Sequence, residues 1–167
     1  SNNVEIVGVH KAKALADQVI TLRNFYTQQV VSRAKESGMK INYDWDVAPN
    51  TLPLPATFTN ELGQQIKKEN PGTAIRLYSR YPFPHRKAKE VYDQFEMDAL
   101  GALEQNPKVA FYREEVINGR LSMRYATADV MTQACVNCHN SHPETPKVGW
   151  KVGDVRGVVE IITPIDQ

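Results

Sequence analysis

The sequence contains very little cysteine and no long apolar run. Cys135 and Cys138 are the only two thiols among its 167 residues, so a fold held together by several disulfides is excluded. Its apolar runs are far shorter than the ~20 residues that a membrane-spanning helix needs. The formal net charge of +1 gives no reason to expect a nucleic-acid partner. No signal peptide is visible at the polar start of this sequence, and we expect one domain over residues 1–167.

Both cysteines lie in one five-residue run, Cys135 to His139, with the pattern Cys-x-x-Cys-His. This pattern is typical of covalent haem c attachment, because the two thiols are spaced to add to the two vinyl groups of the porphyrin. The histidine that follows can bind the iron from the same side. We therefore expect haem c as cofactor. Because bacteria attach haem c outside the cytoplasm, we also expect a periplasmic or extracytoplasmic location.

Three other uses of these residues remain open at this point. A redox dithiol also uses Cys-x-x-Cys, but it gains nothing from His139. Zinc could recruit Cys135, Cys138, His139 and His142, although neighbouring residues rarely ligate one ion. A disulfide closing so small a loop would be strained and would stabilise the chain little.

The first half of the chain predicts a long helix, a short helix and a strand. Residues 9–36 contain no proline, and apolar residues recur there at steps of three and four, which indicates one buried helix face. Gly38 is expected to end this helix. A second helix is predicted over residues 57–69 and a strand over 74–80. The expected face of the first helix consists of Ala12, Leu15, Val19, Leu22, Tyr26 and Val30.

The second half contains the clearest strand signal. Asn118-Gly119 separates two alternating runs and predicts a two-residue hairpin in which Val116 faces Leu121 and Tyr112 faces Tyr125. A helix is predicted before it over residues 86–105, with Val91, Phe95, Ala99 and Leu103 buried. After it, Thr127 is expected to cap the helix that carries the cysteines, with Asp129 in its first turn. Residues 155–162 predict a central strand that is apolar on both faces.

The order of these elements predicts an α+β fold. Electron-transfer cytochromes of the commonest type carry the haem motif near their start and use a downstream methionine, whereas no methionine follows His139 here. Four-helix cytochromes lack the hairpin and the final strand. We therefore expect a PAS-like domain, with a long N-terminal helix and with helices covering one face of an antiparallel sheet.

Six stretches of the sequence, spread over nearly its whole length, resemble a family of PAS-like haem c sensor domains that was long catalogued as a domain of unknown function. Members of that family occur alone or ahead of transmembrane helices and kinase or cyclase modules. The stretches are Leu22 to Thr27, Leu77 to Pro84, Asn118-Gly119, Arg124 to Ala126, Cys135 to Pro143 and Gly153 to Glu160.

The resemblance implies that Cys135 and Cys138 form the thioether bonds and that His139 is the proximal iron ligand. The family has been described with a further cysteine as the second axial ligand, and this chain has none to supply it. The sixth position is therefore open. The thioether of Met123 is one candidate. An open or water-bound iron is another, and His10 and His85 are weaker ones, with His142 better placed for a supporting hydrogen bond.

Haem propionates are anionic and usually meet arginine or tyrosine. Arg156 is the preferred neighbour, because its predicted strand is otherwise apolar. The other candidates are Arg80, Arg124, Tyr78 and Tyr81.

Two functions fit these expectations. The first is an extracytoplasmic sensor that detects redox state or a diatomic gas and signals through residues 9–36, across a homodimer or to transmembrane helices that this chain does not include. The second is a small c-type cytochrome for electron transfer with a redox partner. No acid–base pair points to an enzyme.

Overall fold

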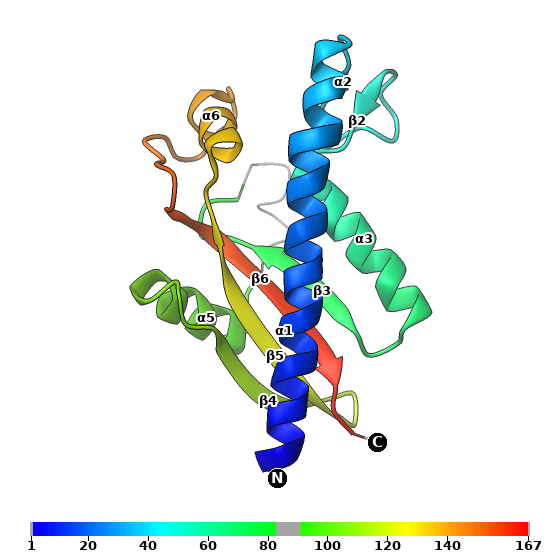
Figure 1. Ribbon diagram of the computed structural model, residues 1–167, viewed down its shortest axis with the longest axis vertical. Coiled ribbons are helices and arrows are strands. Elements are labelled where there is room, and N and C mark those ends of the chain that lie inside the picture. The colour runs from blue at the N-terminus through cyan, green and yellow to red at the C-terminus, as the bar shows by residue number, and fades with distance from the viewer. Residues whose placement is uncertain (1, 83–90, 167) are drawn as a thin grey trace.

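The computed structural model describes residues 2–82 and 91–166, and it shows a mixed α+β fold with a long N-terminal helix (Figure 1). His85 and residues 86–90, the start of the helix predicted over residues 86–105, lie outside the described residues. The elements are α1 (Asn2–Phe25), η1 (Tyr26–Val31), α2 (Ser32–Glu36), β1 (Lys40–Ile41), β2 (Thr51–Leu52), α3 (Pro55–Glu69), β3 (Ala74–Tyr78), α5 (Gln94–Gln105), β4 (Phe111–Ile117), β5 (Arg120–Val130), α6 (Gln133–Ser141) and β6 (Val155–Pro164).

Four antiparallel strands form the main sheet in the order β3-β6-β5-β4. β6 is central, as its two apolar faces predicted. β3 and α3 lie where the sequence predicted a strand and a helix, and a two-residue parallel pair, β1 with β2, lies apart from this sheet.

Helices cover both faces of the sheet, so the expectation of one covered face was wrong. α1 packs with Val159 and Ile161 on one face, where α3 also contributes Ala56 and Ile66. α5 packs with Val158 on the opposite face. The physical reason is the alternation along β6: successive apolar side chains point to opposite faces, and both faces need cover from water.

The long N-terminal helix begins at Asn2 rather than at residue 9, and it runs continuously through a π-helical segment, η1, to Glu36. Gly38 follows it with a φ of 81°, as expected of a residue that ends a helix. The buried face is Ala12, Ala16, Val19, Arg23 and Tyr26.

Two members of the expected helix face are exposed. Leu22 is 48% exposed and Val30 is 39% exposed. Leu22 lies at the side of the buried stripe that Val19, Arg23 and Tyr26 define. Val30 is displaced by η1, because a π-turn adds a residue to the helix, so that the next buried position after Tyr26 is Val31.

The hairpin is confirmed residue for residue. Asn118 and Gly119 have φ values of 50° and 79°, as a type I′ turn requires. Val116 pairs with Leu121, and Tyr112 pairs with Tyr125.

The predicted cap of the cysteine-bearing helix was wrong. Thr127 and Asp129 belong to β5, which continues to Val130, and Thr132 occupies the position before α6. The side chain of Asp129 is buried and pairs with Arg23 instead of capping a helix. A cap motif and a strand end use the same residue types, so the sequence did not distinguish them.

α5 begins at Gln94, and the exposed residue Val91 lies outside it, which corrects the expectation that Val91 is buried. The start is set by a capping box: Asp93 accepts a hydrogen bond from the Glu96 amide, and Glu96 accepts one from the Asp93 amide. Phe95, Ala99 and Leu103 are buried as expected.

Glu96 is also a buried charged residue, and its ion-pair partner Arg76 is 44% exposed. Its carboxylate lies 3.0 Å from Arg76, and its side chain is 1% exposed. Burial raises the pKa of Glu96 to about 7. The folded protein therefore holds a proton on Glu96 more tightly than the unfolded chain does.

This raised pKa predicts how stability depends on pH. The contribution of Glu96 is fully present below about 4.5, its ordinary pKa, and is lost as pH rises through about 7. We compare the free energies of unfolding of the wild type and of Glu96→Gln. The wild type should lose roughly 1–3 kcal/mol relative to the variant as pH rises from about 4.5 to about 7. Urea unfolding at several pH values measures this difference. Glu61→Gln, on the exposed side of α3, should show the wild-type profile, and a profile of Glu96→Gln parallel to that of the wild type would contradict the account.

Candidate functional site

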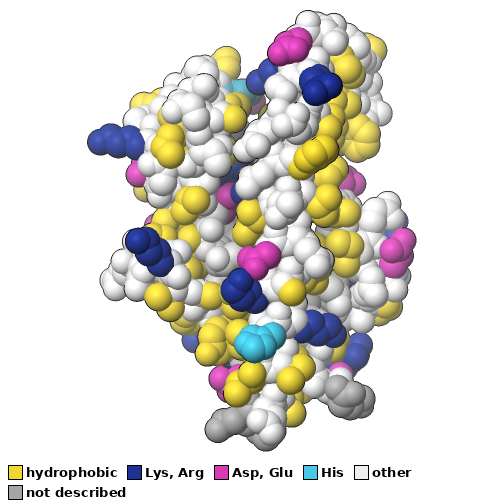
Figure 2. Space-filling view, viewed as in Figure 1, with side chains coloured by type: hydrophobic (Ala, Val, Ile, Leu, Met, Phe, Trp, Pro, Cys, Tyr) yellow, Lys and Arg dark blue, Asp and Glu magenta, His cyan; other side chains and the backbone are white. Residues whose placement is uncertain are grey.

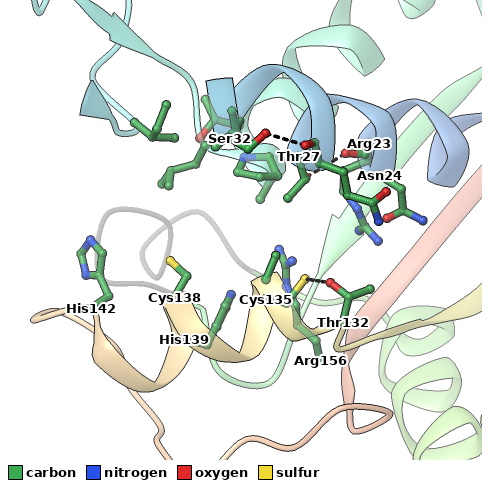
Figure 3. Close-up of a pocket in the computed structure, with 18 of the residues that line it drawn as sticks. Arg23, Asn24, Thr27, Ser32, Thr132, Cys135, Cys138, His139, His142 and Arg156 are labelled. Carbon is green, nitrogen blue, oxygen red and sulfur yellow. Dashed lines mark hydrogen bonds between the residues drawn. The ribbon is translucent and has the colours of Figure 1, made fainter. Parts of the chain in front are cut away.

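A cavity of about 370 Å³ lies between α6 and the second half of the long N-terminal helix. Its size falls within the ~300–1,000 Å³ that is usual for small-molecule and cofactor sites. In the space-filling view the molecule is notched between these two parts (Figure 2). Side chains from both helices point into the space between them (Figure 3).

One wall of the cavity is α6, which presents Cys135, Cys138 and His139. Steps of three and four residues place these side chains on one face of the helix. Both cysteines are free thiols. The Cys135 sulfur lies 3.2 Å from the hydroxyl of Thr132.

The loop after α6 holds the helix in place. The Asn140 side chain donates a hydrogen bond to the Trp150 carbonyl at 3.0 Å and accepts one from the Trp150 amide at 2.8 Å. The Thr145 hydroxyl donates to the His139 carbonyl at 2.6 Å. At the other end, the Met131 amide donates to the Asp154 carbonyl at 2.8 Å. These bonds fix the direction in which the cysteine-bearing face points.

His139 is half-buried beside an aromatic ring. The Trp150 ring meets its imidazole edge-on, with 6.2 Å between ring centroids. Burial and the nearby charge of Arg156 lower the pKa of His139 to about 4, and burial raises the pKa of the Cys138 thiol. At neutral pH the imidazole is therefore neutral, and a neutral ring nitrogen offers the lone pair that a metal ligand needs.

The opposite wall comes from the π-helical segment and its neighbours. Thr27, Gln28 and Val31 of η1 line the cavity, and the Thr27 hydroxyl donates to the Arg23 carbonyl at 2.8 Å. π-helical turns often occur at functional sites. Met39, Ile41 and Leu54 add apolar surface.

The charged residues lining the cavity are basic. Among the described residues, Arg23, Lys35 and Arg156 line it, and no aspartate or glutamate does. Arg23 donates to Asp129 at 2.5 Å, and the Arg156 Nε lies 3.5 Å from the other oxygen of the same carboxylate. The cavity therefore favours an anionic group.

The structure brings six of the predicted site residues together. Tyr81, Arg156 and His142 line the cavity with the three residues of the Cys-x-x-Cys-His motif.

Five candidate site residues lie elsewhere among the described residues. Met123 is fully buried in the core cluster between α1 and the sheet. Tyr78 packs against α5, and Arg80 pairs with Glu104 at 2.8 Å on the surface. Arg124 is held by Glu160 at 2.8 Å, together with Asp93 and Glu115. His10, the weaker ligand candidate, is exposed on α1.

Sequence reasoning missed Arg23, Asp129 and Trp150. Arg23 did carry a signal, because it is a charged residue at a buried step of the amphipathic helix, between Val19 and Tyr26. Asp129 was assigned to the first turn of a helix. The position of Trp150 depends on a loop, for which the sequence offered no pattern.

A family model matches residues 2–164, which include every described residue that lines the cavity. The chain belongs to the Tll0287-like family. Searches among curated proteins and among solved structures gave no match.

Two further findings concern the described part of this Tll0287-like chain. None of its helices is long and apolar enough to span a bilayer. No three or more of its histidine, cysteine, aspartate and glutamate side chains are grouped so that they could hold a metal ion. The four residues considered for zinc therefore do not form such a group.

Proposed function

We propose that this protein is an extracytoplasmic haem c sensor domain. The observation that carries the proposal is the placement of Cys135, Cys138 and His139 on one face of α6, where they open into a basic cavity against the long helix. When bound, haem c supplies a one-electron couple and an iron that can take a diatomic gas.

The chemistry of the lining residues fits this cofactor. The two thiols lie on one face of α6, as attachment through both requires, and neutral His139 offers a ring nitrogen to the iron from the same helix. Arg156 and Tyr81 line the cavity and can hold propionates there. Met123 lies in the core, so we do not propose it as the sixth ligand.

Sensing, rather than electron transfer alone, is favoured by the position of the long helix. The segment from Arg23 to Lys35 forms much of one cavity wall, so a change at the iron acts directly on this helix. We propose that the helix, with the exposed Leu22 and Phe25, carries the signal across a homodimer or to transmembrane helices in a longer chain. We describe the fold as PAS-like on the basis of its antiparallel sheet and leading helix, and we propose no enzymatic reaction.

Electron transfer is the second candidate, because one contact chain leads from the site to the surface. Trp150 lies between His139 and Tyr81, with 5.9 Å between the ring centroids of Trp150 and Tyr81. Tyr81 is exposed. A redox partner docking there would need no movement of the long helix.

Covalent attachment predicts a simple result on denaturing gels. The protein, produced with the machinery for c-type haem attachment, should give a haem-stained band at its own size. Replacing Cys135 and Cys138 together with alanine should abolish the band, because no other thiol exists in the chain. A stained band that survives this double substitution would refute the attachment site.

Iron ligation predicts a difference between His139 on α6 and His142, the residue that follows the end of this helix. His139→Ala should shift the Soret band and lower haem content several-fold, because the iron loses its ligand on that side. His142→Ala is the matched control and should keep the wild-type axial spectrum. Identical absorption spectra for His139→Ala and the wild type, in both oxidation states, would place the ligand elsewhere.

The sensor proposal predicts that iron state changes the long helix. Reduction, or carbon monoxide added to the reduced protein, should change amide hydrogen exchange within residues 9–36, which mass spectrometry can localise. Residues 94–105, on the opposite face of the sheet, are the internal reference. If exchange in residues 9–36 is indifferent to iron state and ligand, electron transfer becomes the better proposal.

The exposed and the buried side of the long helix should respond differently to a charge. Leu22→Glu, at an exposed position, should leave a folded, haem-loaded monomer, whereas Val19→Glu, at a buried position, should unfold the protein.

A further inference from the structure

Three charged side chains meet where the long helix joins the sheet, and two of them, Arg23 and Arg156, line the cavity. Asp129, near the end of β5, receives Arg23 on one oxygen and faces Arg156 of β6 with the other. The side chain of Arg23 is 7% exposed, that of Asp129 is 1% exposed and that of Arg156 is 12% exposed. Two guanidinium groups therefore share one carboxylate, which leaves a net positive charge in a nearly buried place.

Two buried atoms in this cluster have no hydrogen-bond partner: Nη1 of Arg23, and Oδ2 of Asp129, which lies 3.5 Å from Arg156. The unpartnered Nη1 belongs to a residue that lines the cavity. A buried donor without a partner costs free energy, and such groups are rare in folded proteins. The described lining residues offer it no carboxylate, and Lys35 adds a further positive charge.

We propose that Arg23 and Arg156 form a binding site for a carboxylate group, and that Asp129 is the residue that positions both. A carboxylate would neutralise the excess charge and accept a charge-assisted hydrogen bond from Nη1 of Arg23, while Nη2 of the same planar group stays on Asp129. The inference rests on the proposed function for the source of this carboxylate, a haem propionate. A small free carboxylate has the same chemistry and is the other source.

This site would connect the bound group to the long helix. Arg23 belongs to α1, just before the π-helical segment, whereas Arg156 and Asp129 belong to the sheet. In Figure 3, Arg23 enters the cavity from the N-terminal helix and Arg156 enters beside Cys135. A carboxylate bound between them bridges the helix and the sheet.

The first test uses the haem-loaded protein. Resonance Raman spectra report the propionate bending mode, which depends on hydrogen bonds to the carboxylate. Arg23→Gln and Arg156→Gln should each shift this mode, whereas Arg80→Gln should not, because Arg80 pairs with Glu104 outside the cavity. A mode that is unchanged in both cavity variants would overturn the propionate site while leaving haem attachment intact.

The second test uses the free carboxylate and does not depend on haem. Sodium propionate, compared with sodium chloride at equal ionic strength, should raise the melting temperature of the haem-free wild type and of Arg80→Gln. Arg23→Gln should bind propionate roughly tenfold more weakly. If no haem attaches but this pattern is found, the proposed function fails and the site holds for a free carboxylate. If no haem attaches and propionate raises the melting temperature of neither the wild type nor Arg80→Gln, the inference fails together with the proposed function.

Arg23→Gln removes a buried ion pair that supports the fold, so Arg23→Lys serves as a second variant. Lysine keeps the positive charge toward Asp129 but lacks the planar fork. The variant should fold and still show the shifted Raman mode and the weakened binding of propionate. Wild-type behaviour of Arg23→Lys in both measurements would contradict recognition by the guanidinium.

Discussion

The ion pair between Arg23 and Asp129 is the interaction on which the cavity depends. It joins the long N-terminal helix to the last residues of β5, and α6 with both cysteines begins four residues beyond Asp129. Both partners are nearly buried, and removing one partner of such a pair typically costs ~3–5 kcal/mol, because the other charge is left uncompensated. This contact between segments far apart in the sequence adds to the apolar packing of α1 on the sheet in holding the two walls of the cavity in register.

The π-helical segment shapes the same wall. Before it, α1 packs its small residues Ala12 and Ala16 closely against the sheet. The extra residue in the turn changes which side chains face inward, so Thr27 and Gln28 line the cavity while Tyr26 turns to stack on Phe58 at 4.3 Å. The Tyr26 hydroxyl donates to the Pro53 carbonyl at 2.5 Å, which anchors the loop before α3. The local irregularity thus separates a helix half that serves the core from a half that serves the site.

The sequence predicted what local patterns determine. The hairpin register follows from Asn118-Gly119, because only such a pair adopts positive φ readily, and the shared helix face of Cys135, Cys138 and His139 follows from their spacing. The contacts between distant segments were not predictable in this way. Arg124 and Arg156 lie on neighbouring strands. Arg124 forms an ion pair with Glu160, whereas Arg156 lines the cavity. A π-turn has no sequence signature, so the exposure of Val30 was also beyond prediction.

The central claim is that this chain carries haem covalently through Cys135 and Cys138 in the cavity beneath the long helix. Intact-mass spectrometry of the protein, produced in the periplasm together with the machinery that attaches haem c, tests it most directly. The account predicts a mass larger than that of the polypeptide by one haem, with the addition located on the peptide that contains Cys135 to His139. The mass of the unmodified polypeptide, under conditions in which the same cells load a known c-type cytochrome, would contradict it.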